Sequence, residues 1–197
     1  MKIATALALI GAALFAPVKD TSPDAEGFIR NWLVLAPIPI EEGSGATEID
    51  KELVKDEGKL KPKEGDKTKV EGKELTWKAH KTTDFYIDFL EAFGKERGED
   101  VCAYAVAYVI AEEEMKVKLA IGSNDECKAY LNGKEALKFT ETRTLEKDLE
   151  KADVVLNKGQ NVLVLKVINE KNNWQGCARF LKDGSGVKNI KISLTPQ

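Results

Sequence analysis

Hydrophobic and polar residues alternate with the two-residue period of β-strands along much of the second half of the chain. Residues 116–121 alternate cleanly, which is typical of a strand with one buried face. Residues 100–111 and 162–168 are nearly continuous apolar runs rich in Val, Ile, Ala and Tyr. Runs of this kind indicate strands that are buried on both faces. The pattern therefore predicts a sheet with central strands at 100–111 and 162–168.

Turn signals separate these runs. Asn132-Gly133 follows Tyr130-Leu131, and both turn residues tolerate the positive φ of a type I′ hairpin. Residues 158–161 form a second turn, and residues 183–186 form the last hairpin turn, between strands at 176–181 and 187–194. Short strands joined in this way, with no sustained helical period, predict an all-β, antiparallel β-sandwich.

The first half of the chain is less regular. Residues 28–39 predict the first strand, which its two prolines end, and residues 73–79 predict a short alternating strand. Residues 85–94 are interpreted as a strand that runs into a helical turn. Residues 41–73 are rich in Lys, Glu, Asp and Gly, so they predict a flexible, charged insert after the first strand. The whole of 28–197 is predicted to be a single β-sandwich domain.

The N-terminus has the pattern of a secretory signal. Lys2 precedes an uncharged apolar stretch from residue 3 to 16, which is too short for a comfortable transmembrane span. We interpret 1–16 as a signal peptide and 17–27 as a polar linker, and cleavage after Ala13 is an alternative. A buried N-terminal helix or a retained anchor is the other interpretation. The signal predicts a secreted, periplasmic or cell-envelope protein with no membrane span once the signal is removed.

The composition limits the kinds of partner that the protein can bind. The 197 residues carry a formal net charge of −3 with interspersed charges, whereas a nucleic-acid-binding protein needs a basic face. The cysteines number three, so at most one internal disulfide is possible. Cys127 and Cys177 are the first pair to test, and three reduced, buried thiols are the alternative.

The segments at Trp32–Pro39, 103–110, 122–134, 156–167 and 174–180 share a pattern with one family. They include Gly-Ser-Asn-Asp-Glu-Cys-Lys-Ala-Tyr-Leu-Asn-Gly-Lys and Trp-Gln-Gly-Cys-Ala-Arg-Phe. The chain resembles the galactose-binding-domain-like jelly rolls found in exported bacterial proteins and appended to glycoside hydrolases, over roughly residues 28–195 without the insert. The resemblance implies a jelly-roll fold that binds a ligand or supports a partner domain. Two departures from the family pattern are Ala36, where it has Gly, and Asn124, where it often has Asp.

Two polar loops at strand ends supply the candidate ligand site. Asn124 and Asp125 lie in one loop, Trp174 ends the other, and Arg143 is expected to join them. Trp174 would be the aromatic platform for a sugar, and the other three would bind paired hydroxyl groups. The alternative is structural: Asn124-Asp125 caps a turn, Trp174 closes the end of the sandwich and Arg143 pairs with Asp125.

Catalytic signals are weak. His80, the single histidine, lies in a charged segment, and no Gly-x-Ser-x-Gly elbow, P-loop, dinucleotide fingerprint or Cys/His zinc spacing is present. We therefore predict no enzyme, no cofactor and no metal site. The leading hypothesis is an exported, non-catalytic module that binds carbohydrate or a cell-surface component. The alternatives are a structural or protein-interaction module that uses the insert, and a jelly-roll carbohydrate-active enzyme that uses two of its acids.

Overall fold

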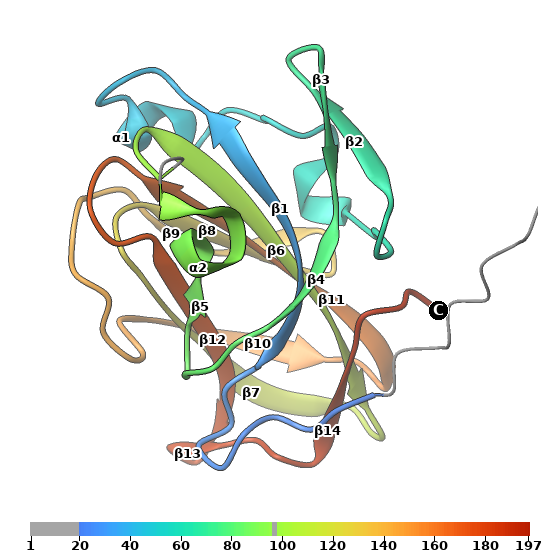
Figure 1. Cartoon of the computed structure of the whole chain (residues 1–197). Coiled ribbons are helices and arrows are strands. Elements are labelled where there is room, and N and C mark those ends of the chain that lie inside the picture. Colours follow the sequence, from blue (N-terminus) through green and yellow to red (C-terminus); the bar gives the residue numbers. More distant parts are fainter. Residues whose placement is uncertain (1–19, 96–97) are drawn as a thin grey trace, which may run out of the picture.

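The computed structural model describes residues 20–95 and 98–197. In this part of the chain, two antiparallel sheets pack face to face (Figure 1). The larger sheet has the order β4 (Lys78–Lys81), β1 (Asn31–Pro39), β6 (Val101–Ala111), β11 (Gly159–Asn169), β8 (Cys127–Leu131) and β9 (Lys134–Phe139), and β14 (Ile190–Ser193) also pairs with β6. The smaller sheet has the order β10 (Glu150–Leu156), β7 (Met115–Ser123), β12 (Gln175–Lys182) and β13 (Ser185–Gly186), and β5 (Ile87–Asp88) also pairs with β12. The structure thus confirms the predicted all-β, antiparallel sandwich; the jelly-roll assignment stays a prediction.

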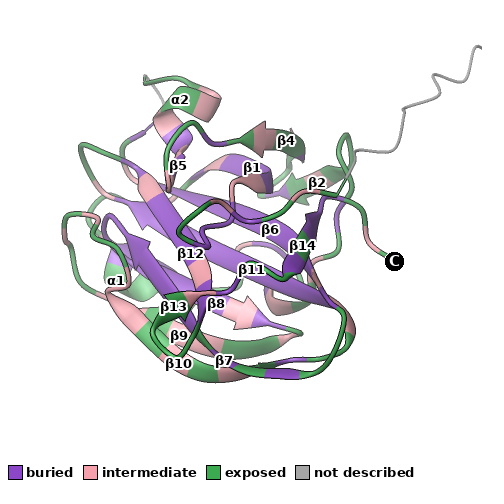
Figure 2. Ribbon diagram, turned by 90° about the horizontal axis from the view of Figure 1, so that it is seen from below, coloured by how far each residue is buried: buried purple, intermediate pink, exposed green. Residues whose placement is uncertain are grey.

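The main core lies between the two sheets. Alternate residues of β6 face it, including Ala103 and Val109, and Phe180 of β12 faces it from the other sheet. Figure 2 shows β6 and β11 buried along nearly their whole length, whereas β10 alternates between exposed and less exposed residues. Each fully buried Val, Leu or Phe side chain contributes about 1.5–3 kcal/mol, so this layer supplies most of the stability.

A second apolar layer covers the outer face of the larger sheet. The other face of β6, with Tyr104 and Tyr108, packs against Ile49, Val54 and Trp77 from the insert and the segment after it. The insert carries α1 (Gly45–Glu48), a 3₁₀ turn (Glu57–Lys59), β2 (Lys67–Val70) and the start of β3 (Lys73–Thr76). The insert was predicted to be a flexible, charged segment. Most of its residues are exposed, but it forms short helices and strands, and its few apolar residues complete a core that the sheet alone leaves open.

The local predictions at the turns hold. Asn132 and Gly133 have φ of 51° and 82°, the left-handed values that a type I′ turn requires, and they connect β8 to β9. β5 runs directly into the short helix α2 (Phe89–Phe93), as predicted. Asp88 is the N-cap of this helix, and its side chain accepts hydrogen bonds from two backbone amides of the first turn.

The segment interpreted as a linker is partly attached to the sandwich. The backbone of Thr21 exchanges hydrogen bonds of 2.9 and 2.7 Å with Ile192 of β14, and Phe28 bridges Arg179 of β12. Residues 20–27 therefore line the sheets instead of leading away from them. The predicted signal peptide, residues 1–16, lies outside the described residues. Among those that are described, no helix has the length and apolarity to cross a bilayer.

All three cysteines are free and buried. Burial raises the pKa of Cys127 to about 11 and that of Cys177 to about 12. The structure therefore shows no disulfide between Cys127 and Cys177, and it agrees with the alternative of reduced, buried thiols.

Candidate functional site

Asp125 joins the two loops that the sequence places at one end of the sandwich. Its carboxylate accepts hydrogen bonds from the backbone N–H of Arg143, at 3.3 Å, and of Glu170, at 3.1 Å. Asp125 has a φ of 51°, which turns its side chain back between the loops. The predicted convergence of the two loops is thus present.

Arg143 lies beside this region and contacts Ser123 and Glu150. Its guanidinium forms a two-point ion pair with Glu150, with N–O distances of 2.7 and 2.5 Å, and donates to the Ser123 carbonyl at 3.2 Å. The same group lies 3.5 Å from the ring centroid of Phe139. Only 12% of the Arg143 side chain is exposed, and its acidic partner is Glu150 and not Asp125 as the structural alternative had it.

Trp174 is part of the core. It is 1% exposed, its ring centroid lies 5.0 Å from that of Phe89, and its indole N–H donates to the Val167 carbonyl at 3.2 Å. A sugar platform must present its face to solvent, so the assignment of Trp174 to that role was wrong. Asn124 and Asp125 are also buried, and both are hydrogen-bonded to the backbone of Arg143, with which they form a closed plug. Trp174 packs on Phe89 instead, so the four predicted residues form no open binding surface.

Glu126, next to this plug, is a buried acid that sequence reasoning did not single out. It is 1% exposed, and its Oε2 has no hydrogen-bond partner among the described residues. Gly45 lies directly against it, since a Cβ at that position would be 2.5 Å from Oε2. Burial, followed by the negative charges of Glu170 and Asp125, raises the pKa of Glu126 above its usual value.

A second missed feature attaches the insert to the larger sheet. Lys166 of β11 is fully buried, and its ammonium donates to the carbonyls of Glu48, at 3.0 Å, and Ile49, at 3.1 Å, near the end of α1. It also lies 3.3 Å from the carboxylate of Glu57. A lysine in the middle of the apolar run 162–168 was the signal for this contact, because a buried charge must be paired.

Glu57 is shared by three sheet residues. Besides the ion pair with Lys166, it accepts hydrogen bonds from the hydroxyl groups of Tyr104 and Tyr130. Burial, with a contribution from Glu57, raises the pKa of both tyrosines far above the usual range. All the polar groups of this cluster are occupied with one another, so the cluster fastens the insert and offers no free group to a ligand.

The single histidine, His80, belongs to the metal-ligating residue types together with Cys, Asp and Glu. His80 is half-buried on β4, its Nε2 has no hydrogen-bond partner, and burial lowers its pKa. Within residues 20–95 and 98–197, no three His, Cys, Asp or Glu side chains come together as a metal ion would require.

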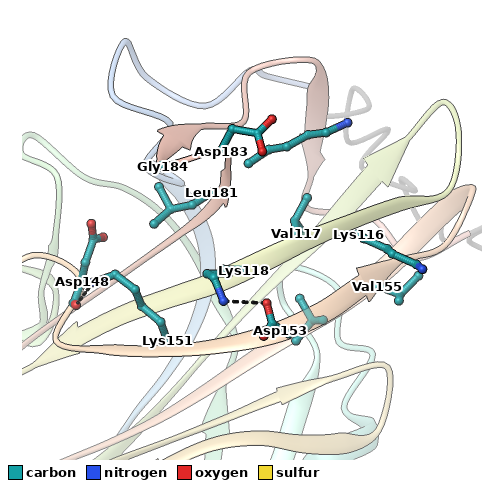
Figure 3. Close-up of a pocket in the computed structure, with 12 residues that line it drawn as sticks. Lys116, Val117, Lys118, Asp148, Lys151, Asp153, Val155, Leu181, Asp183 and Gly184 are labelled. Carbon is teal, nitrogen blue, oxygen red and sulfur yellow. Dashed lines mark hydrogen bonds and ion pairs between the residues drawn. The ribbon is translucent and has the colours of Figure 1, made fainter.

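An open groove of about 860 Å³ lies on the outer face of the smaller sheet (Figure 3). Strand β7 runs along its middle, β10 borders one side and the hairpin between β12 and β13 borders the other. Leu181 and Val155 supply apolar surface, and Val155 is 40% exposed, the one large hydrophobic residue of the described chain that is exposed. The groove combines an apolar strip with charged borders, as ligand-binding clefts do.

The charges in the groove are mainly lysines. Lys118 pairs with Asp153 at 2.7 Å across β7 and β10, and Asp148 is occupied by Arg179. Lys116, Lys151 and Lys182 are exposed, and no carboxylate of the described residues forms an ion pair with any of them. The groove therefore presents ammonium groups without a carboxylate partner on a chain whose formal net charge is −3, and one of them, that of Lys151, donates to the backbone carbonyl of Asp148 at 2.8 Å.

The fold and this groove define an antiparallel β-sandwich with an open cleft on one sheet. No protein-family model and no curated protein matches the chain. Among solved structures, it is similar to the GH31 alpha-xylosidase Xac1773 from Xanthomonas citri, at 9% identity and a TM-score of 0.34. That match covers 58% of this chain and 14% of the xylosidase chain, a similarity that assigns neither a family nor a ligand.

Proposed function

We propose that the protein is an exported, non-catalytic binding module that holds a carbohydrate of the cell surface or its surroundings in the groove over β10, β7 and β12. The observation that carries this proposal is the groove itself, which is open and lies between β10 and the hairpin of β12 and β13. The apolar N-terminal segment of residues 1–16 supports export. The resemblance to galactose-binding-like jelly rolls supports a carbohydrate ligand and belongs to the same proposal.

The arrangement of acids supports a non-catalytic role. Glycosidases usually need two carboxyl groups about 5–9.5 Å apart across the substrate, one of them free to give up or take a proton. In the groove, Asp148 is held by Arg179 and Asp153 by Lys118. Asp183 is then the one acid of the groove without an ion-pair partner among the described residues, whereas a glycosidase needs two acids.

The burial of the apolar residues of the insert favours the groove over the insert as the contact surface. The apolar residues of the insert face the larger sheet, and Glu57 is committed to Lys166. A contact arm would instead present apolar groups to a partner.

Affinity electrophoresis against a panel of neutral and acidic polysaccharides tests the proposal. We expect retardation by at least one polysaccharide, with slower hydrogen exchange in β10 and in the β12–β13 hairpin when it is bound. No retardation by any polymer, or protection confined to residues 41–73, would refute the carbohydrate function at this site. Release of reducing sugar by the purified protein would refute the non-catalytic part.

A further inference from the structure

We propose that the ligand of this groove is an anionic polysaccharide, which the free lysines of the smaller sheet recognise. This inference rests on the proposed function and adds the chemical class of the ligand. Its basis is the lining of the groove: Lys116, Lys151 and Lys182 form no ion pair among the described residues, whereas two of its three aspartates, Asp148 and Asp153, are already paired.

The lysines form a row along one strand and its neighbour. Lys116 and Lys118 are two residues apart on β7, so their side chains leave the same face about 6.7 Å apart. Lys151 of β10 lies opposite Ala120, the next residue of β7 on that face. Three lysine side chains thus leave the same face of the sheet. Lys118 is paired with Asp153, and Lys151 donates to the Asp148 carbonyl at 2.8 Å. Both contacts are at exposed side chains and are therefore weak, so a polymer that carries a charge on each repeating unit can compete for these ammonium groups.

The row continues past the hairpin into a neighbouring hollow. Lys182 borders both the groove and a second cleft of about 680 Å³, which Arg179 and Lys188 also line. Asp183 lies at the same border and has no ion-pair partner among the described residues, so it reduces the positive charge locally. The unpaired groups of the two hollows are then Lys116, Lys151, Lys182 and Lys188 against Asp183 alone, an excess of positive charge.

The side chains favour a polysaccharide over the other anionic polymers. No Phe, Tyr or Trp lines either hollow, whereas single-stranded nucleic acids are usually bound on aromatic stacking platforms. Protein–protein interfaces are enriched in aromatic residues, Met and Arg and depleted in Lys, which is the reverse of this groove. Lysine is a compact point charge that attracts carboxylate or sulfate groups without demanding one geometry, and Val155 offers apolar surface to the C–H groups of a sugar ring.

Two pairs of polymers that differ only in charge test the inference. Polygalacturonate is compared with its fully methyl-esterified form, and dextran sulfate with dextran, by affinity electrophoresis and calorimetry. We expect at least one charged polymer to bind ten times or more tightly than its neutral counterpart, and the affinity to fall as salt screens the charges.

A triple variant locates the binding. Lys116→Gln/Lys151→Gln/Lys182→Gln should weaken binding roughly tenfold, the sum of three exposed charge contacts. The matched control, Lys61→Gln/Lys63→Gln/Lys69→Gln, removes the same charge from exposed positions of the insert and should bind like the unchanged protein. Equal melting temperatures of the two triple variants establish that both are folded.

The outcomes separate the inference from the proposed function. Equal binding of charged and neutral polymers would overturn the inference and leave the carbohydrate function standing. Equal loss in both triple variants, or equally tight binding of poly-glutamate, would also overturn the inference. If no polysaccharide binds at all, both proposals fall.

Discussion

Replacement of Lys166 by methionine tests whether one buried ion pair fastens the insert to the sandwich. Methionine fills a similar volume but donates no hydrogen bond and carries no charge. Lys166→Met leaves the carboxylate of Glu57 buried without its cation, and leaves the carbonyls of Glu48 and Ile49 without a donor. Tyr104 and Tyr130 continue to donate to Glu57, so its carboxylate loses only the cation.

The expected loss of stability follows from the burial of both Lys166 and Glu57. Removal of one member of a buried ion pair typically costs about 3–5 kcal/mol, because the other charge stays desolvated. At about 4 kcal/mol, and with a shift of roughly 2–4 °C per kcal/mol for a chain of this length, Lys166→Met should lower the melting temperature by about 8–16 °C. The double variant Lys166→Met/Glu57→Gln removes the uncompensated charge and should recover about 1–3 kcal/mol.

Lys128 is a matched control on the adjacent strand. It is the register partner of Lys166 and is also buried, but its ammonium reaches the half-exposed Asp50 at 2.7 Å. Lys128→Met should therefore cost about 1 kcal/mol or less. Urea denaturation followed by circular dichroism measures the free energy of unfolding, and limited proteolysis of residues 41–73 reports the attachment of the insert. Equal effects of Lys166→Met and Lys128→Met would refute the reasoning.

Three further substitutions test other parts of the structure. Because the pKa of Glu126 is raised, the folded protein binds the carboxyl proton of Glu126 more tightly than the unfolded chain does. The protonated carboxyl group therefore stabilises the fold below about pH 4.5, and this stabilisation is lost as pH rises through the folded pKa. Glu126→Gln should remove that loss and melt above the unchanged protein at pH 7 but not at pH 4; a difference that grows towards acid would contradict this. Gly122→Ala places a Cβ 2.0 Å from the Glu146 carbonyl, so it should cost about 1–3 kcal/mol in urea denaturation, and an unchanged midpoint would show that the loop can move aside. Gly133→Ala should cost about 1–2 kcal/mol because its φ is 82°, and a smaller loss would mean that the turn changes type.

The strands could be predicted because their signals are local. The apolar runs at 100–111 and 162–168 became β6 and β11, and Asn132-Gly133 became the turn between β8 and β9. The convergence of the loops at Asp125 was also predictable, because it follows from which strand ends share an edge. The burial of Trp174 was not predictable, because Phe89, which packs on it, comes from a helix far earlier in the chain.

The burial of the apolar residues of the insert was missed, although the sequence contained one signal for it. A run such as 100–111 predicts a strand buried on both faces, but a two-layer sandwich covers one face of each sheet. Some other segment had to cover the second face of β6, and residues 41–77 hold the apolar residues left for it, among them Ile49, Val54 and Trp77. Their wide spacing in a charged segment shows no period, so only an account of the whole core could have placed them.

The charged side chains on the two outer faces of the sandwich are arranged differently, so that one set contributes to stability and the other is available for binding. On the insert side, Lys166 and Lys128 are buried and each has an acidic partner, which fixes one arrangement of the chain. On the groove side, Lys116 and Lys182 are exposed and unpaired among the described residues, so they contribute little to folding and stay available to a ligand. Substitution of Lys166 should therefore lower the free energy of unfolding strongly and substitution of Lys128 only slightly, and both should leave ligand affinity intact in the folded fraction. Substitutions at the second pair should do the reverse, because the main core lies between the two faces and neither set of charges reaches across it.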